Sequence, residues 1–185
     1  MEENKKKKIS TKDMVQIAMF TAVVAVLSQI AIPMPSGVPV TLQTLAVALC
    51  GYVLGSKKGA VSLLVYALLG AVGAPVFANF KGGLGAIAGP TGGFIWGFIF
   101  MAFLCGLGVE SKHKWQAVVL GIAGVLVCHA CGAAQFAMIK GNGFWSSALL
   151  VSVPYLVKDF VSVIIALGAA ALIRSRIKVT AAVNQ

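Results

Sequence analysis

The sequence has few charged residues for its length. Asp, Glu, Lys and Arg make up only 11% of its 185 residues, whereas hydrophobic residues make up 59% and the mean hydropathy is +0.94. Soluble domains carry about 25% charged residues, so this scarcity excludes an ordinary soluble domain and indicates an integral membrane protein. The length allows about six spans of ~20 residues. We therefore predict one membrane domain over residues 1–185.

Sequence motifs for nucleotide, metal and catalytic chemistry are also missing. There is no GxxxxGK[ST] loop for the phosphates of ATP, and neither HExxH nor GxSxG occurs. Cys128 and Cys131 form a lone CxxC without the second ligand pair that structural zinc requires. We therefore expect no metal, no bound cofactor and no enzymatic activity, and we interpret the cysteines as packing residues.

Acidic residues are the scarcest charged type. Of the five acids, only Asp159 lies within an apolar run. An ionisable group inside a membrane is costly and usually functional, so we predict that Asp159 accepts a hydrogen bond from a ligand N–H. The alternative is a structural ion pair, for example with Lys81. The adjacent Lys158 should point about 100° away on a helix, so we do not expect it to pair with Asp159.

Apolar runs alternate with short polar breaks along the chain. The runs cover residues 14–32, 41–55, 60–74, 92–109, 115–139 and 146–173, and they predict an all-α protein of six transmembrane helices. With the N-terminus inside, all but three of the 15 Lys and Arg residues fall on the inner side, the exceptions being Lys81, Lys140 and Lys158. This asymmetry predicts cytoplasmic termini, including a basic tail over residues 1–12. The cations mark helix ends and form no continuous face, which argues against nucleic-acid binding.

A segment rich in Gly and Pro interrupts the apolar runs at residues 75–91 and is predicted to be an outer loop. Irregular backbone cannot face lipid, and glycine permits close approach of a ligand. Lys81 within this segment indicates capture of something small and anionic. Further polar candidates are Asn79 in the same segment and Gln43. In the first run, Ala18 and Ala22 form a small-xxx-small pair, which favours close helix packing.

Three segments resemble the BioY family, the biotin-specific substrate-binding subunits (S components) of energy-coupling-factor (ECF) transporters. They are IPMPSGVPVTLQTLAVALCGYVLG at 32–55, GAPVFANFKGGLGAIAGPTGGFIWGF at 73–98 and VPYLVKDFVSVIIA at 153–166. The resemblance implies six helices in a prokaryotic plasma membrane. It also implies that biotin is captured from outside, at a site in the outer half of the membrane. It also implies as partners a membrane coupling protein (T component) and two ATPases, with docking through an AxxxA motif that matches Ala18 and Ala22.

The resemblance also suggests roles for individual residues. Lys81 would attract the biotin carboxylate, and Asp159, beside Lys158, would accept from a ureido N–H. Asn79, Gln43 or Ser162 would serve the remaining ureido positions, while Phe77 and Tyr155 would wall the ring. The sequence departs from the family pattern at Lys81, where relatives often have arginine, and at Ser162, where the family motif has lysine.

Three other interpretations remain open. The chain could be an S component for another vitamin, such as thiamin or riboflavin. It could be a structural membrane subunit without a ligand. An intramembrane enzyme is the most distant alternative, because no nucleophile–base pair is readable in the sequence.

Overall fold

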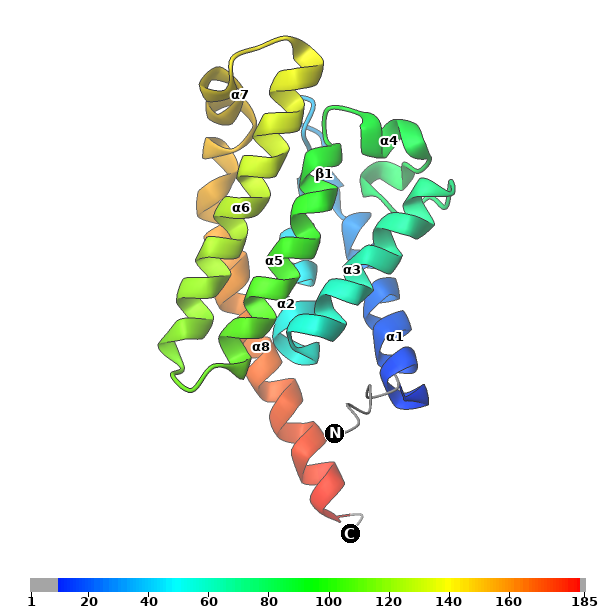
Figure 1. Cartoon of the computed structure of the whole chain (residues 1–185), viewed down its shortest axis with the longest axis vertical. Helices are drawn as coiled ribbons and strands as arrows, with labels where there is room; N and C mark the ends of the chain where they lie inside the picture. The colour runs from blue at the N-terminus through cyan, green and yellow to red at the C-terminus, as the bar shows by residue number, and fades with distance from the viewer. Residues whose placement is uncertain (1–9, 184–185) are drawn as a thin grey trace, which may run out of the picture.

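The computed structural model describes the backbone of residues 10–183 and the side chains of residues 10–176. The basic residues Lys5–Lys8 of the predicted tail lie outside this range. Most of the described chain is helical, as predicted. The helices are α1 Thr11–Ser28, α2 Gln43–Leu54, α3 Ser56–Ala71, the 3-10 turn η1 Ala78–Phe80, α4 Leu84–Ala88, α5 Gly92–Glu110, α6 Trp115–Lys140, α7 Phe144–Val151 and α8 Val153–Val183 (Figure 1).

The connection between α1 and α2 contains a short strand pair that the all-α prediction did not include. Here β1 Ala31–Ile32 pairs antiparallel with β2 Val40–Thr41. Proline fixes its φ angle and lacks an N–H, so Pro33, Pro35 and Pro39 prevent the first helix from continuing through this connection. The extended residues on either side of them pair with each other instead.

The last predicted run is divided into two helices. α7 ends at Val151, Ser152 has a non-helical backbone (φ −122°, ψ −58°), and α8 begins at Val153. Pro154 lies in the first turn of α8, where its missing N–H is tolerated, but in the interior of a continuous helix it would remove a hydrogen bond and clash with the preceding turn. The break therefore follows from a local sequence signal.

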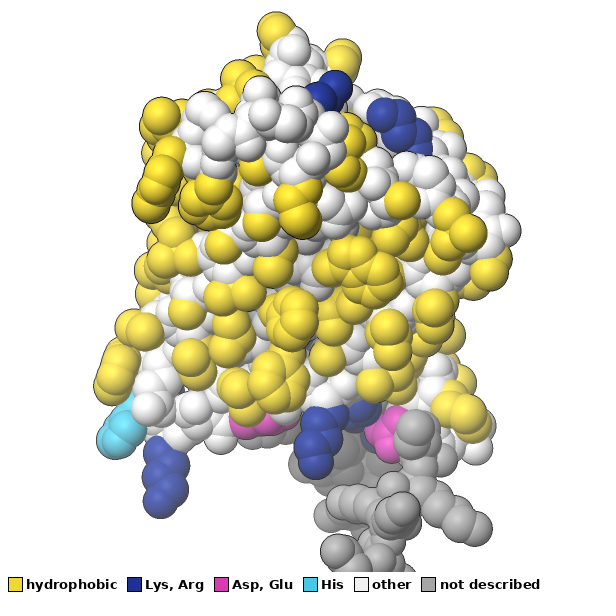
Figure 2. Space-filling model, turned by 45° about the horizontal axis from the view of Figure 1, so that its top comes forward, with side chains coloured by type: hydrophobic (Ala, Val, Ile, Leu, Met, Phe, Trp, Pro, Cys, Tyr) yellow, Lys and Arg dark blue, Asp and Glu magenta, His cyan; other side chains and the backbone are white. Residues whose placement is uncertain are grey.

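Four helices are long and apolar enough to cross a membrane within the described residues: α1, α5, α6 and α8 up to Arg176. α2 and α3 have 12 and 16 residues, or about 18 and 24 Å at 1.5 Å per residue. Gly55, with φ +84°, lets α2 turn directly into α3. In the view of Figure 2, hydrophobic side chains cover the middle of the molecule and charged side chains lie toward its two ends, as expected of a surface that meets lipid.

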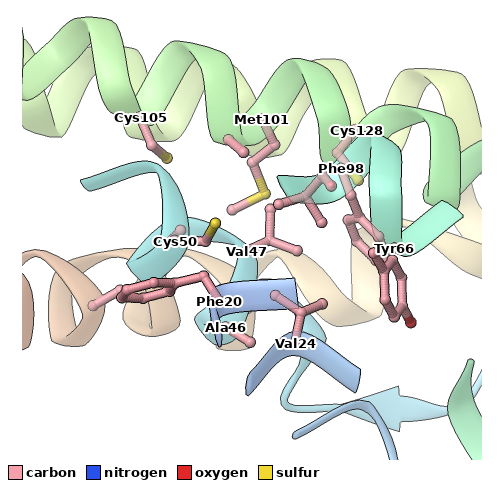
Figure 3. Packing of buried hydrophobic residues seen from close by; sticks show 14 of the residues in the cluster. Phe20, Val24, Ala46, Val47, Cys50, Tyr66, Phe98, Met101, Cys105 and Cys128 are labelled. Atoms are coloured by element: carbon pink, nitrogen blue, oxygen red, sulfur yellow. The ribbon is translucent and has the colours of Figure 1, made fainter. Parts of the chain in front are cut away.

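The hydrophobic core joins α1, α2, α3, α5, α6 and α8. Val24, Val47, Tyr66 and Met101 meet there with less than 2% of their surface exposed (Figure 3). Cys50, Cys105 and Cys128 are buried in the same cluster, as expected of packing residues. α1 begins and α8 ends at the same end of the bundle, and the 75–91 segment lies at the other end (Figure 1).

Candidate functional site

A cavity lies among the ends of the helices on the side of the 75–91 segment. Its walls come from the α1–α2 connection, the start of α2, the 75–91 segment, α5, α6, the end of α7 and α8. The lining residues are Val38, Pro39, Thr41, Gln43, Thr44, Phe77, Ala78, Lys81, Ala86, Thr91, Phe94, Ile95, Phe98, Met101, Val125, Cys128, His129, Val151, Tyr155, Lys158 and Asp159.

Six of the eight residues predicted for ligand binding line this cavity: Gln43, Phe77, Lys81, Tyr155, Lys158 and Asp159. Asn79 and Ser162 are not among the lining residues. Asn79 is exposed, with left-handed backbone (φ 59°, ψ 38°) inside η1. Ser162 is buried one turn further along α8, where its hydroxyl donates to the Lys158 carbonyl at 2.9 Å.

Two charged residues near the start of α8, Lys158 and Asp159, form one polar cluster with a histidine of α6. Asp159 is only 4% exposed, and its Oδ2 lies 2.9 Å from His129 Nε2. The other oxygen, Oδ1, forms an ion pair with Lys158 Nζ, and Lys158 Nζ also donates to the Thr41 carbonyl at 2.9 Å. We call Lys158, Asp159 and His129 the polar cluster.

This geometry corrects the prediction that Lys158 and Asp159 do not pair. The prediction considered only the directions in which adjacent side chains leave a helix. The lysine stem has four carbons and folds back far enough for its ammonium to reach the neighbouring carboxylate. Lys81, the cation suggested as a structural partner for Asp159, makes no such ion pair in the described part of the chain.

His129 is a residue of the cavity that the sequence did not predict, and it lies inside the lone CxxC of Cys128 and Cys131 in an apolar run. A signal was nevertheless available. An ionisable residue within a span needs a partner. His129 is the only histidine in the apolar runs of the sequence, and Asp159 is the only acid in them. The ring of Phe94 packs edge-on against His129, with centroids 5.7 Å apart.

Apolar side chains supply most of the remaining wall. Phe77 is 4% exposed and packs edge-on against Tyr66, with ring centroids 5.4 Å apart. A Cβ at Gly70 would overlap the Phe77 ring, so glycine is needed for this placement. Gln43 donates through Nε2 to the Tyr66 hydroxyl at 2.8 Å and accepts from Thr41 Oγ1 at 3.2 Å. These two bonds leave one amide N–H of Gln43 for a ligand.

Tyr155 of α8 is hydrogen-bonded to the connection between α1 and α2. Its hydroxyl lies 2.7 Å from Ser36 Oγ and donates to the Val38 carbonyl, also at 2.7 Å. Val38 and Pro39 are themselves part of the cavity wall. The phenol therefore has two structural roles, because its ring lines the cavity while its hydroxyl holds another part of the wall in place.

Hydrogen bonds from Gln29, just after α1, hold the segment that carries Lys81. Gln29 accepts from the Phe80 N–H at 2.9 Å and donates to the Val76 carbonyl at 3.2 Å. Within the segment, the Phe77 N–H donates to the Lys81 carbonyl at 3.0 Å. These bonds hold the left-handed turn at Asn79 and Phe80 and place Lys81, an exposed residue, against the cavity.

Comparison with known proteins gives consistent matches along the chain. Residues 3–179 match the model of the BioY family. A biotin transporter BioY of Thermotoga maritima is 44% identical over 122 residues, covering 65% of this chain and 72% of that protein. One of Rhodobacter capsulatus is 37% identical over 164 residues, covering 80% and 86%.

A solved structure has the same fold. The crystal structure of an S component for biotin from an ECF-type ABC transporter superposes with a TM-score of 0.78 over 95% of each chain, at 24% sequence identity. At 24% identity this structural similarity establishes the fold alone. The family is established by the match to the family model and by the sequence relatives.

Proposed function

The chain belongs to the BioY family, and from that premise we propose that it is the biotin-binding S component of an ECF-type transporter. One observation carries the assignment to this cavity. The cavity combines a cation near its edge, apolar walls and a buried carboxylate, and biotin presents a carboxylate, an apolar ring and a ureido group with two N–H donors.

The contacts of the described residues support one orientation of biotin. Asp159 Oδ1 is paired with the Lys158 ammonium, but a carboxylate oxygen has a second lone pair, with which it can accept a ureido N–H. Of the three candidates for the other ureido positions, only Gln43 lines the cavity, so we assign a ureido contact to Gln43. Lys81 takes the carboxylate, and Phe77 and Tyr155 wall the ring.

We also propose six membrane-crossing helices with both termini in the cytoplasm of a prokaryotic cell. α2 and α3 would make shorter, tilted crossings in addition to the four long helices. The start of α1 and the end of α8 at one end of the bundle support an even number of crossings. The distribution of Lys and Arg then assigns that end to the cytoplasm and the cavity to the outer half of the plasma membrane.

The proposed partners are a T component and two ABC-type ATPases. The absence of a nucleotide-binding motif from this chain requires that ATP be hydrolysed by another subunit. Ala18 and Ala22 are both exposed on α1, one turn apart, and leave a shallow surface on which another helix can pack closely. This surface is the docking site that we assign to the T component.

Mass spectrometry of the purified protein tests the proposal. The chain is purified from cells grown with biotin, and small molecules released on denaturation are identified. Thermal unfolding is then measured with biotin, thiamin and riboflavin. We expect biotin in the released fraction and an increase in Tm with biotin alone. Stabilisation by another vitamin instead, or by none of the three, would reject the biotin assignment.

A further inference from the structure

The charges of the polar cluster cancel one another, and this affects which ligands the cavity binds. Asp159 contributes one negative charge, and Lys158 contributes one positive charge in direct contact with it. Their side chains are 6% and 30% exposed, and that of His129 is 9% exposed. Among the residues that the structure describes, Asp159 is the only acid that lines the cavity. Its charge is therefore compensated before any ligand enters.

The hydrogen bonds of His129 indicate its protonation state. Nε2 faces the Asp159 carboxylate at 2.9 Å and so carries a hydrogen. Nδ1 is buried and has no hydrogen-bond partner in the described part of the chain. A second N–H at Nδ1 would be a buried charged donor without an acceptor, which costs more than an unpaired lone pair. This geometry is that of an imidazole whose hydrogen is on Nε2, the tautomer that donates to Asp159.

We propose that the polar cluster makes the cavity selective for an uncharged N–H donor, such as a urea, over a cation of the same shape. Lys158 is the specificity-determining residue, because it removes the net negative charge that would attract a cation. His129 is a positioning residue, because its Nε2–H holds Oδ2 of Asp159 and so fixes the direction of Oδ1, which accepts from the ligand while paired with Lys158. The inference rests on the proposed function and refines it.

A pair of ligands tests the charge balance. 2-Iminobiotin has an imino group in place of the ureido oxygen, so it is a cyclic guanidine that is protonated at pH 7, while the rest of the molecule matches biotin. The measured quantity is the ratio of the two dissociation constants of the purified full-length chain. We expect the wild type to bind biotin at least a hundredfold more tightly than 2-iminobiotin.

The decisive variant combines Lys158→Met with His129→Gln. Lys158→Met alone keeps the imidazole of His129, a group that can carry a positive charge, beside Asp159, so it should change the ratio less. Glutamine can replace the Nε2–H donor but cannot become charged, so the double variant leaves Asp159 uncompensated. We expect its preference for biotin to fall at least tenfold relative to wild type. Lys140→Met, at the exposed end of α6, is the matched control and should leave the ratio unchanged.

The positioning role of His129 has its own comparison. His129→Leu removes the donor to Asp159 and should weaken biotin binding about tenfold, whereas His129→Gln should recover most of that loss. An unchanged ratio in the double variant would overturn the specificity role of Lys158. Equal losses in the Leu and Gln variants would overturn the positioning role of His129.

A measurement without ligand separates this inference from the proposed function. His113, exposed in the turn before α6, is the only other histidine, so a His113→Gln protein gives ¹⁵N imidazole signals from His129 alone. We expect one protonated and one unprotonated nitrogen at pH 7. Two protonated nitrogens would overturn the charge balance. Failure of the wild type to bind biotin would instead reject the proposed function.

Discussion

Removing the Tyr155 hydroxyl should loosen the wall of the cavity without removing the ring that lines it. The hydroxyl makes two hydrogen bonds of 2.7 Å, to Ser36 and to the Val38 carbonyl. A hydrogen bond contributes about 0.5–1.5 kcal/mol net, so Tyr155→Phe removes about 1–3 kcal/mol of attachment. Water and the nearby Ser36 hydroxyl can satisfy the Val38 carbonyl in part, which favours the lower half of that range.

A change of about 1.4 kcal/mol corresponds to a tenfold change in an equilibrium constant. We therefore expect the dissociation rate of biotin from Tyr155→Phe to rise about tenfold, because the detached α1–α2 connection opens more often. Stopped-flow displacement of bound biotin by excess unlabelled ligand measures this rate. Amide hydrogen exchange of residues 36–39 measures the detachment itself, independently of any ligand.

Ser36→Ala provides the matched comparison. It removes one of the two bonds and keeps the bond to Val38, so its effect should be smaller than that of Tyr155→Phe. Combined with Tyr155→Phe, it should add only the loss of the Ser36 contacts with the Val38 backbone at 3.4 Å, because the phenol hydroxyl that Ser36 bonded is already gone. Unchanged exchange at residues 36–39 in Tyr155→Phe would refute the claim that this hydroxyl holds the connection.

Three further variants test other parts of the account. Lys81→Ala should remove the preference for biotin over biotin methyl ester, measured by calorimetry; a preference of wild-type size would rule out Lys81 as the carboxylate partner. Gly70→Ala should displace the Phe77 ring and cost about 1–3 kcal/mol through overpacking, lowering Tm, and an unaltered Tm would show that the ring has room to move. Glu110→Gln weakens the cap of α3, since Glu110 accepts from the Ser56 N–H at 2.8 Å and the Ser56 hydroxyl at 2.7 Å. It should lower stability by about 1 kcal/mol while biotin affinity stays constant, and a fall in affinity would contradict the separation of this cap from the cavity.

Apolar runs predicted the helical parts of the fold because lipid imposes long, uncharged helices. The ends of the third to fifth predicted runs agree with α3, α5 and α6 to within a few residues. The short strands at Ala31–Ile32 and Val40–Thr41 left no signal, since two-residue pairing depends on where the prolines direct the chain. Pro154 was a signal for the break at Ser152, but the continuous apolar run led to the prediction of a single helix there.

The residues of the candidate site also differ in whether the sequence could predict them. Asp159 stood out in the sequence because it is the one acid in an apolar run, and Lys81 because it is a cation among glycines. The pairing of Asp159 with His129, 30 positions earlier, depends on how α6 packs against α8, which periodicity does not specify. Asn79 was a reasonable candidate by chemistry, but its left-handed backbone serves the turn that presents Lys81.

The central claim is that this chain binds biotin in the cavity through the Asp159 carboxylate. Isothermal titration of biotin into the purified wild type and into Asp159→Asn tests it most directly. A hydrogen bond to a charged acceptor contributes about 1.5–3 kcal/mol, so we predict that the variant binds biotin about tenfold to a hundredfold more weakly while remaining folded. Equal affinity of the two proteins, or no binding of biotin by the wild type, would contradict the account.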